Sequence, residues 1–303
     1  MRRHRLAIVA IAALPLLIGP RGLHAQTLDK QLQKALDAGD MDAALKLAAL
    51  DQSPADVRFF FLDMVRECAS EMTCTVALAP LSAKPARDLS SQGAELPVPQ
   101  TGWVVVTQKS KDGTGSGKME MPYGTVGGKP VVLGARLTAA KVASLRASSN
   151  ESLMDEALAQ GIYDSKLGER RTDWKKVATR LGAGGGEFGA FLVQRAAALQ
   201  KAVAANDPEA AAAAGGRWAA MVFGAEGYDG PVPLKARQAK LRTQSQRFLH
   251  DVKVLGGYQL GDDAMLMVEA KDGAGWTARG PILVSRNEDG FDVAGDLTIA
   301  YPE

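Results

Sequence analysis

Hydrophobic residues recur at helical spacing in the first part of each half of the chain. One face of the helix predicted to begin at Pro54 carries only apolar side chains and a cysteine, so we expect this face to be part of a core. These residues are Val57, Phe60, Phe61, Met64, Val65 and Cys68. Similar spacing predicts helices at 29–38, 41–50, 137–146 and 151–160, and then at 188–204, 208–223 and 234–251.

Each set of helices is followed by apolar stretches of strand length, separated by turns rich in glycine, aspartate and asparagine. The predicted strands are 75–78, 102–109, 118–122 and 131–136, and then 252–258, 264–270, 276–286 and 291–299. Strands joined in series by short turns pair in antiparallel fashion. The pattern therefore predicts an α+β fold of two related domains, each with helices packed on one face of a curved antiparallel β-meander.

Two sequence matches between the halves indicate a tandem duplication. The sequence Leu-Gln-Lys-Ala occurs at 32–35 and again at 199–202. The turn Lys-Asp-Gly-Thr-Gly at 111–115 matches Lys-Asp-Gly-Ala-Gly at 271–275, at a similar displacement along the chain. Because the helical and strand matches come in the same order, we interpret them as a repeat. The alternative is a coincidence between Ala-rich helices and between two hairpins.

The matches divide the chain into four parts. We predict a signal peptide at 1–25, a first α+β domain at 26–147, a helical and glycine-rich linker at 148–187, and a second α+β domain at 188–303. Four of the five residues from 182 to 186 are glycine. Since glycine restricts the backbone least, we expect the most flexible point of the linker there.

The second half resembles the NTF2-like, or cone-shaped, α+β domains that occur in many extracytoplasmic bacterial proteins. The resemblance lies in helices that lead into a curved meander with an apolar strand, a Lys-Asp-Gly turn and a closing strand near Phe291. It covers 188–303 and, through the duplication, 26–146. Enzymes, immunity proteins and binding modules share this fold, so the resemblance does not decide the function.

The segment 1–25 has the pattern of a cleavable secretory signal peptide. A cationic start is followed by an almost wholly apolar run at 6–19, which is too short to span a bilayer. Ala25 provides the small residue that suits the last position before a cleavage site. We therefore expect a periplasmic mature protein that begins at Gln26 and does not span the membrane.

Loss of the signal peptide changes the charge of the protein. The whole chain has 36 basic and 34 acidic residues and a net charge of +2. Removal of Arg2, Arg3, Arg5 and Arg21 leaves 32 basic residues against 34 acidic ones, which is a net charge of −2. This balance argues against a nucleic-acid partner.

The two cysteines, Cys68 and Cys74, lie close together in the sequence. In an oxidising compartment such a pair predicts a disulfide that ties the end of a helix to the start of a strand. A zinc site needs more cysteine and histidine ligands than the mature chain has.

The mature chain has few residues for standard catalytic sites. His250 is its one histidine, and we place it at a helix end. The glycine-rich segment 112–119 departs from a phosphate-binding loop at Asp112 and Met119. We therefore predict no catalytic residue, no metal site and no cofactor. An aspartate or glutamate acting with a tyrosine in a cone pocket leaves an enzyme as an alternative.

Five basic residues lie in a predicted helix that contains no acidic residue: Lys235, Arg237, Lys240, Arg242 and Arg247. We interpret this helix as a docking surface for an acidic partner or an anionic envelope polymer. The alternative is a solvated helix face. Three aromatic residues of the second meander, Tyr258, Trp276 and Phe291, either line a pocket or belong to the core.

Together these features predict an exported, non-enzymatic binding protein whose partner is an unknown protein or small-molecule ligand of the envelope. One form of this function is an immunity or inhibitor protein. The alternatives are a small-molecule enzyme of the NTF2-like isomerase type, which would use Asp, Glu and Tyr, and a structural component that binds an anionic polymer.

Overall fold

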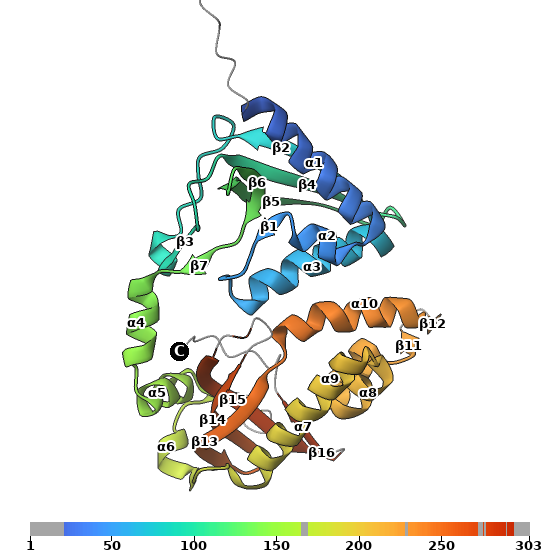
Figure 1. Cartoon of the computed structure of the whole chain (residues 1–303). Coiled ribbons are helices and arrows are strands. Elements are labelled where there is room, and N and C mark those ends of the chain that lie inside the picture. The colour runs from blue at the N-terminus through green and yellow to red at the C-terminus, as the bar shows by residue number, and fades with distance from the viewer. Residues whose placement is uncertain are drawn as a thin grey trace, which may run out of the picture.

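The computed structural model describes residues 21–164, 169–227, 230–271, 275, 277–288 and 290–293. In this part of the chain, ten α-helices and two five-stranded sheets confirm the predicted α+β class. Figure 1 shows the two sheets at opposite ends of an elongated molecule, with helices α3 (Ala55–Ser70) and α10 (Leu234–Gln244) between them. Most of the predicted signal peptide and the end of the last predicted strand lie outside the described residues.

The first sheet is an antiparallel meander with one parallel strand, β1, added at its edge. Its strands, in spatial order, are β1 (Ala48–Ala49), β6 (Lys129–Leu133), β5 (Ser116–Val126), β4 (Gly102–Ser110) and β2 (Met72–Pro80). One face packs on α1 (Arg21–Ala38), α2 (Met41–Leu45) and α3 and forms a core with them. The predicted order of helices followed by a meander is confirmed here.

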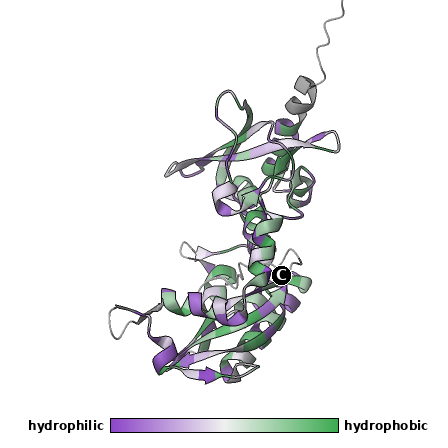
Figure 2. Cartoon of the chain, turned by 90° about the vertical axis from the view of Figure 1, so that its left-hand side faces the viewer, coloured by the Kyte–Doolittle hydropathy of each residue, from purple (hydrophilic) through white to green (hydrophobic). Residues whose placement is uncertain are grey.

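The second sheet has the strand order β10-β13-β14-β15-β16, and all neighbouring strands are antiparallel. Its strands are β10 (Thr179–Leu181), β13 (His250–Leu260), β14 (Asp263–Lys271), β15 (Thr277–Asn287) and β16 (Gly290–Val293). One face packs on α7 (Gly186–Ala205), α8 (Pro208–Ala214), α9 (Gly216–Phe223) and α10. Hydrophobic residues run through the helices and strands around both sheets (Figure 2).

Helices also cover the other face of the second sheet, which differs from the predicted packing on one face. Here α5 (Asn150–Gln160) and α6 (Trp174–Val177) form a separate cluster with β13, β14 and β15. Trp174 is 1% exposed and packs against Met265 and Met267. The segment 148–187, predicted to be a linker, therefore supplies two helices and the edge strand β10 to this sheet.

The glycines at 182–186 form a close-packed turn in place of the flexible point that we predicted. The N–H of Gly184 donates to the carbonyl of Val254 at 3.0 Å. A Cβ atom on Gly185 would lie 2.8 Å from Cγ1 of Val254. Glycine is needed at this turn because the backbone passes close to β13, so the residues that suggest freedom in the sequence instead permit close contact.

Two predicted helices end earlier than their hydrophobic pattern suggests, and a third is divided in two. The helix 41–50 ends at Leu45, because residues 48–49 pair with β6. The helix 208–223 is divided at Gly215 and Gly216, of which the latter has a φ of +70°. The helix 234–251 ends at Gln244, and His250 begins β13 by pairing with Lys271. Strand pairing therefore overrides helix propensity at two of these ends.

Short elements connect the main layers. They are the pairs β3 (Ala94–Glu95) with β7 (Arg136–Leu137), β8 (Ile162–Asp164) with β9 (Glu169–Arg171) and β11 (Glu226–Gly227) with β12 (Gly230–Pro231), the helix α4 (Ala139–Ala147), and the 3₁₀ turns η1 (Ser90–Gln92) and η2 (Ser245–Arg247). Arg279 of β15 fastens the α4–α5 junction to the second sheet, since its guanidinium donates to the side chain of Asn150 at 2.6 Å and to the carbonyl of Ser148 at 3.0 Å.

The predicted disulfide is confirmed. The Sγ atoms of Cys68 and Cys74 lie 1.98 Å apart, and the bond joins the last turn of α3 to β2. Both cysteines are buried in the first core.

One residue of the predicted apolar face of α3 lies at the surface: Phe60 is 59% exposed, although its spacing predicts a core position. Phe59 is buried instead, on the side of α3 that faces η2.

Candidate functional site

The predicted basic helix, α10 with η2, packs against α3 and so lies between the two sheets (Figure 1). We call this contact between α3 and α10 with η2 the joint. Arg237 is only 7% exposed, and its guanidinium contacts Glu209 at 2.5 Å and the carbonyl of Phe223 at 3.3 Å. Arg237 therefore holds α8, α9 and α10 together, and it is not part of a docking surface.

The acidic partner of this basic helix belongs to the same chain. Arg242 forms an ion pair with Asp42 of α2. Nε of Arg247 lies 2.8 Å from Oδ1 of Asp56, and its guanidinium lies 4.7 Å from the ring centroid of Phe59. Two of the five predicted docking residues therefore pair with carboxylates of the first half of the chain, Arg247 across the joint and Arg242 on α2 beside it.

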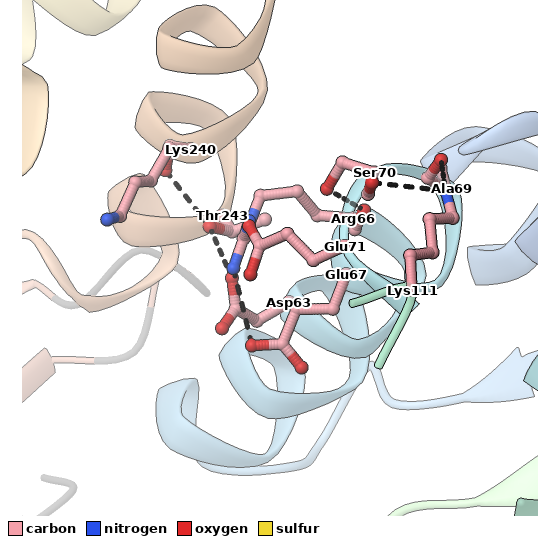
Figure 3. A network of polar contacts seen from close by, with 9 residues as sticks. All are labelled: Asp63, Arg66, Glu67, Ala69, Ser70, Glu71, Lys111, Lys240 and Thr243. Atoms are coloured by element: carbon pink, nitrogen blue, oxygen red, sulfur yellow. Dashed lines mark hydrogen bonds and ion pairs between the residues drawn. The ribbon is translucent and has the colours of Figure 1, made fainter. Parts of the chain in front are cut away.

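A polar network continues along the joint (Figure 3). The hydroxyl of Thr243, which is fully buried, lies 2.9 Å from the carbonyl of Lys240 and 3.3 Å from Oδ1 of Asp63. Asp63 also accepts from Nε of Arg66 at 2.7 Å. Burial raises the pKa of Glu67, and the neighbouring carboxylate of Asp63 raises this pKa further.

Sequence reasoning identified the cations of the joint and overlooked their partners. Asp56, Asp63 and Glu67 stand at positions i, i+7 and i+11 of α3, a spacing that places three carboxylates on one helix face. An acidic stripe on one helix and a basic helix elsewhere in the chain are a signal for internal pairing. The prediction used the apolar face of α3 and did not consider its acidic face.

Beside the joint, α10 forms one side of a groove of about 480 Å³ whose walls come from both halves of the sequence. We call it the joint groove. Four apolar residues, which we call the floor, line it (Met41, Val203, Ala239 and Leu241), together with Gly39, Asn206, Gln238 and Ser245 and two exposed cations, which we call the rim (Lys235 and Arg242).

The two ends of the joint groove are corresponding turns of the predicted repeat. Gly39, with a φ of +62°, precedes Asp40, whose side chain accepts from the N–H of Ala43 at 2.9 Å. In the second half, Asn206 has a φ of +50° and precedes Asp207, which accepts from the next helix in the same manner at 3.0 Å. The side chain of Gln238 donates to the carbonyl of Asn206 at 3.2 Å and so fixes the second turn to α10.

Two cations give the rim of the joint groove a positive charge. Lys235 is exposed and forms no ion pair among the residues that the structure describes. Arg242 keeps further N–H donors beside the one that contacts Asp42. Polar side chains supply more of the accessible lining than the apolar ones do, and both cations are exposed. The lining therefore suits an anionic ligand with an apolar part.

The predicted pocket aromatics do not come together. Tyr258 lies on the face of the second sheet that packs on α5 and α6. Phe291 lies on the opposite face, in the main core, with its ring centroid 5.1 Å from that of Phe188 and 5.3 Å from that of Phe191. Trp276 lies outside the described residues. Phe291 therefore packs against the main core, on the opposite face of the sheet from Tyr258.

Two further observations bear on the chemistry. The hydroxyl of Tyr258 lies 3.4 Å from Oε1 of Glu151, which also contacts Lys175 at 3.0 Å. None of these residues lines the joint groove. The same part contains no group of three or more His, Cys, Asp or Glu side chains arranged to hold a metal ion.

No helix among the described residues is long and apolar enough to cross a membrane. In comparisons with protein-family models, curated proteins and solved structures, nothing matched this chain. The resemblance to NTF2-like domains therefore stays a prediction, and the joint groove is the feature that bears most directly on function.

Proposed function

We propose that the protein is an exported binding protein that holds a small amphiphilic anion in the joint groove. The observation that supports this function is the lining: the floor residues, which come from both halves, line the same groove as the rim cations Lys235 and Arg242. The apolar body of the ligand is removed from water on the floor, and its anionic head group is placed beside the two cations.

Binding of decanoate to the mature protein, measured by isothermal titration calorimetry, tests this function. Decanoate has a carboxylate head and a flexible apolar chain, and decyltrimethylammonium has a comparable chain with a cationic head. We expect decanoate to bind and decyltrimethylammonium to bind at least about tenfold more weakly, since the rim is positive. Equal affinity for both compounds, or no binding of decanoate, contradicts the proposal.

The substitution Lys235→Glu locates the binding site. Because it reverses the charge of an exposed rim residue, we expect about a tenfold loss of decanoate affinity with an unchanged circular dichroism spectrum. Lys129→Glu is the matched control, since Lys129 is also exposed and starts β6 in the first sheet. This control is expected to bind within about twofold of the wild type. An equal loss in both variants would show that decanoate responds only to net charge.

Export is the second part of the proposal. Its support is the sequence pattern of the segment 1–25. Fractionation of cells followed by mass spectrometry of the intact protein tests it, and we expect a periplasmic chain that begins at Gln26. A chain that keeps Met1 and stays in the cytoplasm contradicts export without affecting the binding proposal.

A further inference from the structure

The face of the first sheet opposite its helices carries a second, separate basic surface. Val76, Val104 and Met119 point into the core. Because side chains alternate along a strand, the residues next to them point away from it. We call this side the outer face. It contains Thr73, Thr75, Ala77, Val105, Thr107, Lys109, Ser116, Lys118 and Glu120.

The strand register arranges these side chains in rows across the sheet. One row is Thr73, Lys109 and Ser116, and the next is Thr75, Thr107 and Lys118. All six of these residues are exposed. Successive rows on one face of a sheet are about 7 Å apart, because they are separated by two residues. Each of these rows therefore offers hydroxyl groups and one ammonium group to the solvent.

The next row, Ala77, Val105 and Glu120, carries one carboxylate, and two lysines contact it. Nζ of Lys118 lies 2.7 Å from Oε1 of Glu120, and Lys84 contacts the other oxygen of this carboxylate. Lys84 belongs to a loop that also carries Arg87 over the sheet. Two of these cations, Lys84 and Lys118, pair with Glu120, while Lys109 stands two rows further along the outer face and Arg87 lines the groove beside it.

The loop that carries Lys84 and Arg87 is fastened to the sheet. Nε1 of Trp103 donates to the carbonyl of Lys84 at 3.0 Å, and the Lys84 ammonium lies 4.6 Å from the centroid of the Trp103 ring. The N–H of Arg87 donates to the side chain of Gln100 at 3.0 Å. Between the loop and the sheet lies a groove of about 720 Å³, lined by Trp103, Lys118 and Glu120 among others.

We propose that the outer face binds a linear polyanion, an extended polymer with an anionic group on successive units. The cations are spread over three rows, so a small anion would reach only part of them, whereas an extended chain lying along β5 passes Lys109, Lys118 and Lys84 in turn. The exposed hydroxyls of Thr73, Thr75 and Thr107 supply hydrogen bonds to its backbone. This surface is independent of the joint groove, because α1 to α3 lie between the two.

Titration of the mature protein with sodium polyphosphate and, separately, with polygalacturonate tests this proposal and distinguishes a phosphate polymer from a carboxylate polymer. Neutral dextran is the control ligand. We expect binding of at least one polyanion in 50 mM NaCl, with an affinity that falls at 200 mM NaCl because released counterions contribute to binding. Absence of binding to both polyanions in 50 mM NaCl overturns the proposal.

A pair of charge-reversed variants locates the polymer. Lys109→Glu with Lys118→Glu changes the outer face, and Lys30→Glu with Lys34→Glu makes the same charge change on exposed residues of α1. We expect the first variant to bind at least about tenfold more weakly and the second within about threefold of the wild type. Affinities of the two variants that agree within about threefold overturn the proposal. Lys109→Gln with Lys118→Gln repeats the comparison if charge reversal impairs folding.

Discussion

Gln33 occupies the place of a neighbouring strand beside β2. Its side-chain amide donates to the carbonyl of Cys74 at 3.0 Å and accepts from the N–H of Val76 at 2.8 Å. These are the two kinds of bond that an added strand makes with a sheet edge. β2 is an edge strand of the first sheet. Gln33 therefore protects an edge that would otherwise be open to pairing with another chain.

We expect Gln33→Ala to destabilise the protein by about 1–3 kcal/mol, since two hydrogen bonds are lost. The exposed edge is also expected to cause association that increases with protein concentration, measured by sedimentation velocity. Gln31→Ala is the matched control, because Gln31 is exposed on the same helix. If both variants have the wild-type melting temperature and remain equally monodisperse, Gln33 does not protect the edge.

Glu120 is the carboxylate on the outer face whose ionisation the structure defines best. Hydrogen bonds from Lys118 and Lys84 lower its pKa to about 2. The contribution of these ion pairs to stability is therefore fully present above the unfolded pKa of Glu120, about 4.3. It is lost as the pH falls through the folded pKa of about 2.

We expect the carboxyl ¹³C resonance of Glu120 to titrate with a midpoint near 2 in the wild-type protein. Replacing both lysines by glutamine removes the groups that stabilise the carboxylate, so the midpoint is expected to rise toward about 4.3. A wild-type midpoint above 4, or the same midpoint in both proteins, contradicts the described contacts.

Single residues differ in how well the sequence predicts them. The disulfide follows from two cysteines that lie close together in a chain that we predict to be exported. The roles of Phe59 and Phe60 cannot be derived in this way. Adjacent residues on a helix differ by about 100° in direction, and which of them is buried depends on where α10 packs. The burial of Arg237 could not be predicted either, because it depends on the packing of α10 against α8, where its partner Glu209 lies.

At the scale of elements, the predicted repeat has a structural counterpart. The turns after α1 and α7 have the same hydrogen bonds: the N–H of Asp40 donates to the carbonyl of Ala35, and that of Asp207 to that of Ala202, both at 2.9 Å. Lys111 directly follows β4, and Lys271 is the last residue of β14, and each of these is the second strand of its meander. The fifth strands differ, since β1 lies beside the last meander strand and β10 beside the first. Duplication stays a prediction that these observations support.

The boundaries of the elements were less predictable than their order. Hydrophobic spacing locates the meander strands, because turn residues separate them in both halves. It cannot show that β1 pairs with β6, because that pairing depends on residues far away in the sequence. It also cannot place α5 and α6 on the second sheet, since an amphipathic helix does not specify which surface covers it.

The α3 helix provides a test of the joint through pH. Burial raises the pKa of Glu67 in the folded state, so its ionised form makes the folded state less stable above that pKa. This loss is recovered as the pH falls through the folded value toward the unfolded value of about 4.3.

We therefore expect Glu67→Gln to melt at a higher temperature than the wild type at pH 8, with a smaller difference at pH 4. Differential scanning calorimetry at both pH values measures this change. Glu156→Gln, on the exposed side of α5, is the control and is expected to show no such dependence. A variant that is less stable than the wild type at pH 8 would show that the contacts of Glu67 with its cations outweigh its burial.

At the scale of the whole molecule, buried residues form separate clusters, and each sheet has its own core. The α10 helix connects them: Leu241 belongs to the core of the second sheet, and Ala239 packs against that of the first. The joint therefore determines whether the sheets unfold together or separately. The joint groove lies beside this contact, so a ligand that binds there stabilises the joint through mass action.

Phe59 is buried at the joint beneath the guanidinium of Arg247, and Phe60 beside it is 59% exposed. We expect Phe59→Ala to destabilise the protein by about 3 kcal/mol and Phe60→Ala by less than about 1 kcal/mol. Since each core can melt without the other once the joint is weakened, the calorimetric enthalpy of Phe59→Ala should exceed its van 't Hoff enthalpy. Phe60→Ala should keep the wild-type ratio. A single two-state transition in Phe59→Ala would mean that the two sheets form one cooperative unit that does not depend on Phe59.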